Sequence, residues 1–185
     1  KVGRDSLTVY DDPHLEGGLN SRPFDDEGYP TEKKAVIRGG ILQTYLHNSL
    51  TAKRHKARLT GNAGWIAPRP WNVVVETGDL SEEEILGELK RGLFVNNMGY
   101  VRFQDYVKGD FSAVLRDGIF LVEGGEIKGA VRNLRFSENL LRVLSSIKGL
   151  TREARQVSHW WMEWGSSVAT PMIFAEKLLF TKPTK

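Results

Sequence analysis

The stretch from Val9 to Gly28 holds the residues whose types and spacing best suit chemistry, because two aspartate pairs flank paired glycines and two prolines. Proline fixes its backbone φ angle and glycine can adopt positive φ, so this composition predicts a loop of defined shape. The carboxylates could serve as general acids or bases. Asp25, Asp26 and Glu27 are adjacent, however, and neighbouring side chains point in different directions. The alternative is a surface loop in which Asp, Gly and Pro serve only the turns.

Other familiar catalytic patterns are incomplete. The four histidines include no pair at helical i,i+4 spacing and no H-E-x-x-H motif. His47 and His55 lie eight residues apart and would share a helix face only in one continuous helix, so a chance surface pair is the default interpretation. The G-x-S-x-G motif is absent, and Gly61–Gly64 lacks the Lys-Ser/Thr of a phosphate-binding loop. Zero cysteines exclude disulfides, thiolate nucleophiles and cysteine-ligated zinc within this chain.

Composition indicates a soluble globular protein. The chain has 185 residues, 40% of them hydrophobic and 26% charged, which suits one domain over residues 1–185. No run of about 18 apolar residues and no signal-peptide pattern occurs, so we expect a cytoplasmic protein without a membrane span. The net charge is only +3, and the basic cluster Lys53–Arg58 is interpreted as a solvated helix face, so nucleic acid is not an expected partner. The first residue is Lys1, which suggests a piece of a longer protein.

Three helices are predicted around these loops. Ser81–Arg91 has a capping box at Ser81 and Glu84, an apolar stripe and a stop at Gly92. Glu138–Lys148 places five apolar side chains inward and ends at Gly149. A third helix begins at Asn48 or Ser49 and reaches Ala57.

The remaining pattern is that of strands. Two β-prone runs joined by Gly39-Gly40 predict a hairpin, and the glycine-rich pairs Asp117-Gly118 and Gly124-Gly125 predict an antiparallel meander. The chain is therefore expected to be α+β, strand-rich with antiparallel hairpins and a meander, and at least two short helices. The predicted strands are 7–10, 33–38, 41–46, 72–76, 93–95, 111–115, 119–122, 127–136 and 171–180. The cluster Trp160–Trp164 is open to two interpretations, core filling or a binding surface.

The ordered series of motifs resembles the C-terminal half of the TldD/PmbA family, a set of intracellular zinc metallopeptidase subunits. The opening loop matches V-x-D-D-P-x-L-x-G-x-x-x-S-x-P-F-D-x-E-G, and the motifs that follow keep the family's order over nearly the whole chain. They are I-R-G-G-I-L-Q-T-Y-L at 37–46, T-G-N-A-G at 60–64, G-D-F-S at 109–112 and E-G-G-E-I at 123–127.

The resemblance implies where zinc would be bound. Family members bind it through an H-E-x-x-x-H helix upstream of this region, and catalytic members add a late cysteine; this sequence contains neither. The D-D-P, P-F-D-x-E-G and T-G-N-A-G forms are more similar to the PmbA (TldE) branch, which lacks the zinc ligands and partners the catalytic subunit. We therefore expect no cofactor in this chain, and zinc in a catalytic partner or in a missing upstream segment.

The same resemblance implies a role in proteolysis. The chain would form walls of the peptide channel and a subunit interface. It would form a dimer with an identical or a TldD-like subunit. Its further partners would be the upstream half of the same protein and an unfolded or extended peptide. An exposed sheet edge can hold such a peptide by main-chain hydrogen bonds. On this hypothesis the Asp25-Asp26-Glu27 loop and Thr60, Gly61 and Asn62 shape the channel; alternatively these turns only connect strands. Two other functions stay open: a catalytic zinc peptidase whose helix is upstream, and a non-enzymatic protein- or nucleic-acid-binding modulator.

Overall fold

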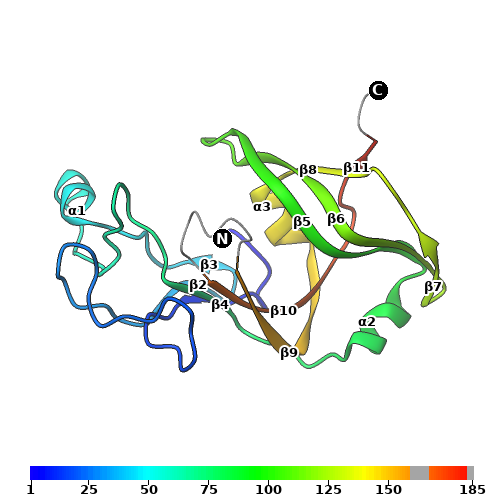
Figure 1. Ribbon diagram of the computed structural model, residues 1–185, viewed down its shortest axis with the longest axis horizontal. Coiled ribbons are helices and arrows are strands. Elements are labelled where there is room, and N and C mark those ends of the chain that lie inside the picture. The colour runs from blue at the N-terminus through cyan, green and yellow to red at the C-terminus, as the bar shows by residue number, and fades with distance from the viewer. Residues whose placement is uncertain (159–166, 183–185) are drawn as a thin grey trace. The chain divides into compact units, whose positions relative to one another are not determined.

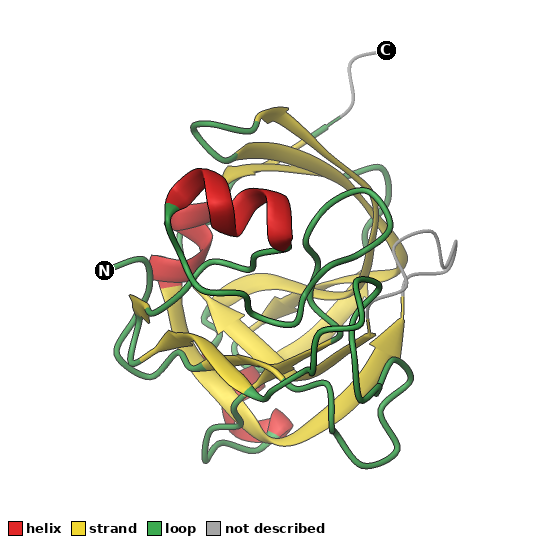
Figure 2. Ribbon diagram, turned by 90° about the vertical axis from the view of Figure 1, so that its left-hand side faces the viewer, coloured by secondary structure: helices red, strands yellow, loops and turns green. Residues whose placement is uncertain are grey.

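A computed structural model describes residues 1–158 and 167–182 of the chain. Within them the chain is α+β, with three short helices among many strands and long loops, which confirms the expected fold class (Figures 1 and 2). The predicted binding or packing role of Trp160–Trp164 lies outside the described residues. None of the described helices is both long enough and apolar enough to cross a membrane.

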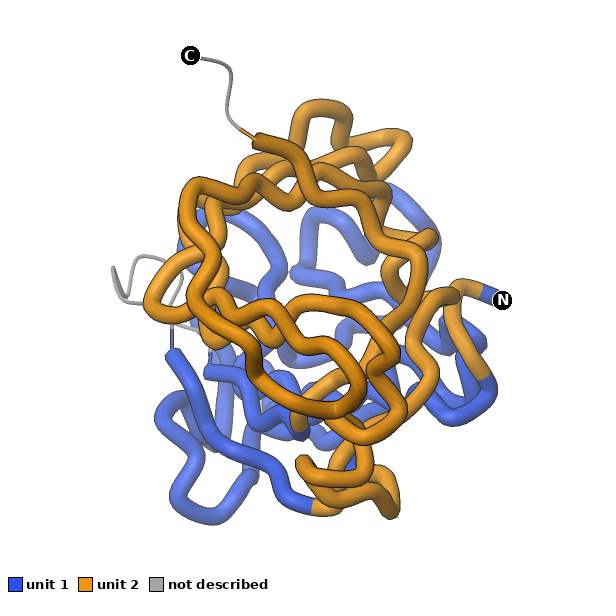
Figure 3. Tube along the Cα trace, turned by 90° about the vertical axis from the view of Figure 1, so that its right-hand side faces the viewer, with its two compact units in different colours: residues 1, 5–77, 153–171 blue, residues 2–4, 78–152, 172–185 orange. Residues whose placement is uncertain are grey.

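The chain forms two compact units (Figure 3). Unit 1 consists mainly of residues 5–77 and the described part of 153–171. Unit 2 consists mainly of residues 78–152 and the described part of 172–185. Each unit is built around one sheet, and strands β9 and β10 contribute residues to both units.

The sheet of unit 1 has six strands in the order β3-β2-β1-β4-β10-β9. The short strand β1 is paired antiparallel with β2 on one side and with β4 on the other, while β4 and β10 run parallel. The predicted β2–β3 hairpin is confirmed, and its turn uses Gly39 and Gly40 at φ 56° and 71°. The strands are Val9–Asp11 (β1), Lys34–Arg38 (β2), Ile41–Leu42 (β3), Asn72–Val75 (β4), Ile147–Ser158 (β9) and Ser167–Ala175 (β10).

The sheet of unit 2 has five strands, four of them in the order β11-β8-β6-β5, and β7 pairs with β6. Its core contains the buried side chains of Ala113, Leu115, Ile119 and Phe136. The aromatic ring of Phe136 contacts Phe111 and Phe180, with ring centroids 5.7 and 5.4 Å away. The strands are Arg91–Asp105 (β5), Asp110–Glu123 (β6), Glu126–Ala130 (β7), Arg135–Asn139 (β8) and Phe180–Thr181 (β11).

The predicted meander is wrong at Asp117-Gly118. This pair does not reverse the chain but lies inside the continuous strand β6, at φ 58° and 116°. The β5–β6 register shifts opposite it, between Val95 and Asn97, so the two residues form an irregularity in a long ladder. Asn97 spans this irregularity by donating to the Asp117 carboxylate at 2.7 Å. A dipeptide typical of hairpin turns therefore serves here as a bulge.

The predicted helices form but are shorter than their patterns. The helix α2 is Glu82–Glu88, with the capping box at Ser81 and Glu84 confirmed, and it ends before Arg91 because Arg91 pairs with Glu123 in the β5–β6 ladder. The helix α1 is Ser49–His55, capped by Asn48. For both helices the sequence predicted the N-cap residue, whereas the last helical residue was not predictable from the local pattern.

The third helix, α3 (Leu140–Ser146), corrects two predictions. Glu138 belongs to β8 and Gly149 to β9, so strand pairing limits the helix at both ends. None of its residues is buried, and Leu140 and Leu141 are exposed rather than inward. The predicted strand 171–180 is likewise divided between β10 and β11, with Lys177 at φ 58° between them.

Candidate functional site

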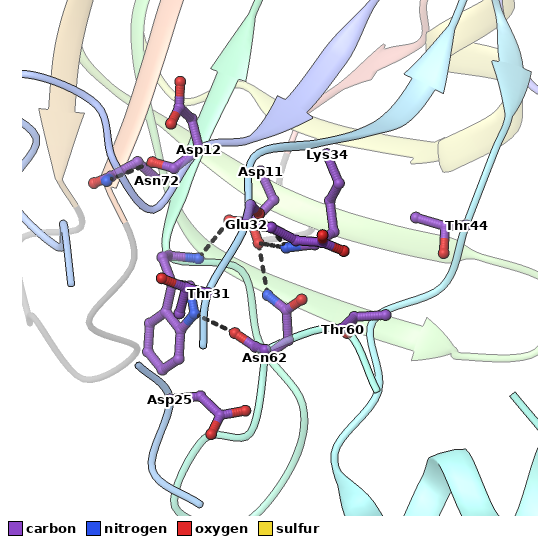
Figure 4. A network of polar contacts seen from close by, with 12 residues as sticks. Asp11, Asp12, Asp25, Thr31, Glu32, Lys34, Thr44, Thr60, Asn62 and Asn72 are labelled. Atoms are coloured by element: carbon purple, nitrogen blue, oxygen red, sulfur yellow. Dashed lines mark hydrogen bonds and ion pairs between the residues drawn. The ribbon is translucent and has the colours of Figure 1, made fainter. Parts of the chain in front are cut away.

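A buried carboxylate, that of Asp11, stands at the end of β1 in unit 1. Its Oδ1 accepts the backbone N–H of Trp71 at 2.7 Å, and its Oδ2 accepts the Asn62 side-chain amide at 2.6 Å and the Lys34 ammonium at 3.3 Å. Figure 4 shows the Asp11 carboxylate between Lys34 and Asn62. Asp11 and Lys34 are register partners in the β1–β2 ladder, so strand pairing itself sets the opposite charges face to face.

The side chain of Trp71 connects the glycine-rich loop to the same buried region around Asp11. The indole is fully buried, and its Nε1–H donates to the backbone carbonyl of Gly61 at 2.8 Å. The guanidinium carbons of Arg22 and Arg69 lie 3.9 and 4.8 Å from the centroid of the indole ring, within the range of cation–π attraction. The loop that contains Arg22 and the loop that contains Gly61 are thus packed on one side chain.

Asn72, the first residue of β4, uses both ends of its side-chain amide. Its Nδ2 donates to the Asp12 carbonyl and to Ser21 Oγ, and its Oδ1 accepts from the Asn20 backbone and from Ser167 Oγ. Asn72 and Ser167 are fully buried register partners of the parallel β4–β10 pair. The Asn72 side chain therefore joins the opening loop to the sheet of unit 1, and both its amide nitrogen and its amide oxygen are paired by hydrogen bonds.

Asp25 ties the two predicted site loops together. One carboxylate oxygen accepts the backbone N–H groups of Glu27 and Tyr29 at 3.0 and 2.9 Å, and the other accepts the N–H of Ala63 at 2.9 Å. Asp25 is buried, so its charge is satisfied by backbone donors rather than by solvent. Asp26 adds a backbone bond from its own N–H to the Ala63 carbonyl.

The three adjacent acids have three different environments, as the sequence predicted. Asp26 is exposed and forms an ion pair with Arg22 at 3.2 Å. Glu27 accepts the backbone N–H and the hydroxyl of Ser49 at 2.8 and 2.7 Å, which places its charge at the first turn of α1. No pair of these carboxylates is arranged for acid–base catalysis.

Thr60, Gly61 and Asn62 are buried or closely confined. Thr60 Oγ1 accepts the N–H of His47 and donates to the carbonyl of the same residue. Gly61 adopts φ 66°, and a Cβ there would come 2.5 Å from the Pro30 carbonyl oxygen. Asn62 donates to Asp11 and to the Arg69 carbonyl, while its Oδ1 has no hydrogen-bond partner among the described residues.

The structure therefore brings all six predicted site residues into one set of loops, residues 12–31 and 59–70 of unit 1, which we call the loop cluster. Sequence reasoning missed four residues that hold it together, Lys34, Trp71, Asn72 and Ser167. Lys34 lies opposite Asp11 in the β1–β2 pair, whereas the predicted hairpin joins β2 to β3, so the hairpin gave no signal for this ion pair. No local sequence pattern marks Trp71 or Ser167, because their partners are distant in the sequence and come close only in the folded chain.

One titratable group at the edge of the cluster has a shifted pKa. Lys33 Nζ lies 2.8 Å from Asp12 Oδ2, and this hydrogen bond, with the attraction between the charges, raises the pKa of the Lys33 ammonium above its ordinary value. Asp12 is buried whereas about half of the Lys33 side chain is exposed, so the pair lies at the rim of the cluster.

The loop cluster and the adjoining helix α1 carry several exposed apolar side chains. Trp65 and Ile66 are 95% and 94% exposed at the tip of a turn that is closed by the Ala63–Pro68 bridge. Phe24, Tyr29 and Leu50 are also exposed, on segments that Asp25 and Glu27 hold by hydrogen bonds. Contiguous exposed apolar patches are typical of surfaces that contact another molecule.

The residues present do not assemble a metal centre of the usual kind. Within residues 1–158 and 167–182, no three or more His, Asp or Glu side chains come together in a way that could hold a metal ion. The arrangement can fix loops and present exposed apolar side chains. The Thr31 hydroxyl lies 3.1 Å from His14 Nε2, but it donates its proton to the Arg22 carbonyl.

Comparison with known proteins shows what the chain is similar to. Residues 1–182 match the model of the PmbA/TldA metallopeptidase C-terminal domain. The metalloprotease PmbA of Escherichia coli is 37% identical over 74% of this chain and 29% of its own length. The chain spans about a third of the length of the curated relatives it matches.

Two solved structures are similar over nearly the whole chain. The structure of TldE from Thermococcus kodakarensis is 26% identical, with a TM-score of 0.82 over 97% of this chain and 40% of that one. A Thermotoga maritima protein, described as a proposed modulator of a DNA gyrase, is 32% identical with the same TM-score and coverage.

Proposed function

Because this chain belongs to the PmbA/TldA metallopeptidase C-terminal domain family, we propose that it is part of a metallopeptidase subunit that acts on extended peptides. We assign it to the PmbA-like, non-catalytic partner, which forms channel walls and a subunit interface in the cytoplasm. The similarity to PmbA and to TldE supports that branch. The single observation that carries the role is the loop cluster, a fixed framework with exposed apolar side chains.

The buried residues of the cluster support a positioning role. Asp25, Thr60 and Asn62 direct their polar groups at backbone and side-chain partners inside the cluster, so they set the shape of the loops rather than touch a peptide. Gly61 allows the closest approach to Pro30. The walls of the proposed channel are then formed by the exposed side chains that these loops carry, among them Trp65 and Ile66.

An extended peptide also needs main-chain partners. The strand β5 is the last strand in the strand order of the unit 2 sheet, and it is 15 residues long. Edge strands can bind a peptide by strand addition, which depends on main-chain hydrogen bonds and not on the peptide sequence. The position of β5 in the sheet therefore supports this mode of binding.

The described residues do not supply a group of three ligands for the metal ion that the names of the relatives imply. With no suitable group of three ligands among them, we derive no step of peptide hydrolysis from this chain. In the proposed assembly the metal, zinc, is held by the catalytic partner subunit or by an upstream segment of the same polypeptide.

The first test is the metal content of the full-length protein, purified alone and with its TldD-like partner, together with hydrolysis of an unfolded peptide. We expect peptidase activity only in the mixed complex, which should also hold more zinc than the protein purified alone. Stoichiometric zinc and activity in the protein alone would make it a catalytic peptidase. Absence of both from every preparation would remove the protease role.

The second test concerns the exposed apolar side chains. Trp65→Ser should reduce association with the partner subunit or the peptide at least tenfold, while leaving the midpoint of urea unfolding unchanged, because Trp65 is exposed. The matched control is Val107→Ser, which changes an equally exposed apolar residue in the β5–β6 turn. Equal binding by both variants would exclude the Trp65 loop from the interface.

A further inference from the structure

Two imidazole rings meet beside α1. The ring centroids of His47 and His55 are 5.9 Å apart, at an interplanar angle of 38°. His47 precedes the N-cap residue, and His55 is the last residue of the helix. Thr51, which contacts the His47 ring, lies four residues before His55 within the same helix.

Hydrogen bonds hold both the backbone and the side chain of His47 in place. Its backbone N–H donates to Thr60 Oγ1 at 2.8 Å and its carbonyl accepts from the same hydroxyl at 3.1 Å. Its side chain is buried, and the ring Nδ1 lies 3.2 Å from Thr51 Oγ1. The ring therefore has a fixed orientation before any ligand arrives.

The hydrogen bonds around Thr51 favour one tautomer of His47. The Thr51 hydroxyl lies 3.0 Å from Asn48 Oδ1 and accepts the Asn48 N–H at 3.1 Å, as the capping box requires. A hydroxyl has one proton, so when that proton bonds to Asn48 the Thr51 oxygen can only accept from the ring. His47 then carries its proton on Nδ1, and Nε2 keeps a free lone pair. Metal-binding histidines are commonly arranged in this way, with the second nitrogen donating to a neighbour.

We propose that His47 and His55 form a two-imidazole site for a borderline divalent metal ion, Zn²⁺, Ni²⁺ or Cu²⁺, with water completing the coordination. Two imidazoles on one tetrahedral ion have ring centroids about 5 Å apart, given metal–nitrogen bonds of roughly 2.1 Å. The observed 5.9 Å is close to this, and the exposed His55 side chain can supply the adjustment.

The charged residues near the histidine pair, and the type of its ligands, determine which metal ions the site can bind. Lys53, Arg54 and Lys56 are exposed on or just after α1, and among the described residues no Asp or Glu joins the histidine pair to make a group of three metal ligands. Mg²⁺ and Ca²⁺ depend on oxygen ligands and negative charge, so they are excluded. Neutral imidazole nitrogens bind Zn²⁺, Ni²⁺ and Cu²⁺ instead. This site is independent of the proposed protease role, and no step of hydrolysis is assigned to it.

The experiment is a Zn²⁺ titration of the 185-residue chain, prepared without a polyhistidine tag, by isothermal calorimetry at pH 7.5. We expect one Zn²⁺ per chain, and His55→Gln should weaken binding at least tenfold. Because His55 is exposed, this variant should keep the wild-type fold. The matched control is His14→Gln, which changes another exposed histidine whose ring bonds to Thr31 instead.

Nuclear magnetic resonance supplies the second readout. The ring Cε1–H signals of His47 and His55 should shift together on addition of Zn²⁺ and remain unchanged with Mg²⁺. Lowering the pH to 5.5 should weaken Zn²⁺ binding, because protons compete for the imidazole nitrogens. Undiminished binding by His55→Gln, loss of binding in His14→Gln, or no shift of the His47 signal would each overturn the proposal.

Discussion

The backbone N–H of Trp71 donates a 2.7 Å hydrogen bond to the carboxylate of Asp11, across 60 positions of sequence, and both residues are fully buried. The same carboxylate accepts from Lys34 and Asn62. One side chain thus joins strand β1, strand β2, the glycine-rich loop and the start of β4. Because the glycine-rich loop leads directly to Trp65 and Ile66 of the proposed channel walls, the shape of the site depends on the buried Asp11 carboxylate.

Replacing Asp11 by Asn should be among the most destabilising single changes in unit 1. It leaves the Lys34 ammonium buried without its counter-charge, and breaking one partner of a buried ion pair costs about 3–5 kcal/mol in the free energy of unfolding. Urea unfolding followed by circular dichroism measures the change. The control is Asp5→Asn, whose exposed pair with Lys1 should contribute no more than about 1 kcal/mol. Similar losses in the two variants would contradict the assigned role of Asp11.

Neighbouring aspartates should behave very differently. Asp25→Ala removes the acceptor of three backbone N–H groups and should lower the free energy of unfolding by at least about 3 kcal/mol, since even one bond to a charged group is worth roughly 1.5–3 kcal/mol. Asp26→Ala removes one exposed ion pair and should cost under about 1 kcal/mol. Proteolytic cleavage in the loop cluster, compared between the two variants, shows whether Asp25 holds the loops. Equal cleavage rates would mean that it does not.

Two glycines should respond to alanine with opposite signs. Gly61→Ala forces a side chain into φ 66° and against the Pro30 carbonyl oxygen, so the free energy of unfolding should fall by at least about 2 kcal/mol. Gly87→Ala lies inside α2 with open space around it and should raise the free energy of unfolding by about 0.5–1 kcal/mol. The urea midpoints of the two variants test both signs, and a stable Gly61→Ala protein would disprove the tight approach.

The Lys33–Asp12 pair predicts a pH dependence. The hydrogen bond to Asp12 raises the pKa of Lys33, so its small stabilisation is complete below the ordinary lysine value of about 10.4 and is lost as the pH rises through the raised pKa. Titration of the Lys33 side-chain resonances should give a lower pKa in the Asp12→Asn protein than in the wild type. An unchanged Lys33 pKa in that variant would assign the shift to another cause.

The sequence alone determined the class of fold and the local starts of its elements. The capping box at Ser81, the cap at Asn48 and the Gly39-Gly40 turn were all readable, because each is a contact between residues a few positions apart. The motifs in the opening loop and at Thr60–Gly64 located the two loops that meet in the structure. Local hydrogen-bonding rules and turn chemistry were sufficient for these predictions.

Only the tertiary structure decided where elements end and what the site residues do. The β6 strand runs through Asp117-Gly118, and β9 takes Ile147 and Gly149 from the predicted helix, because long-range strand pairing outweighs a local turn or helix preference. The same reason explains the candidate site. Asp11, Trp71 and Ser167 are far apart in sequence, and His47 lies outside the helix that ends at His55, so their contacts exist only in the folded chain.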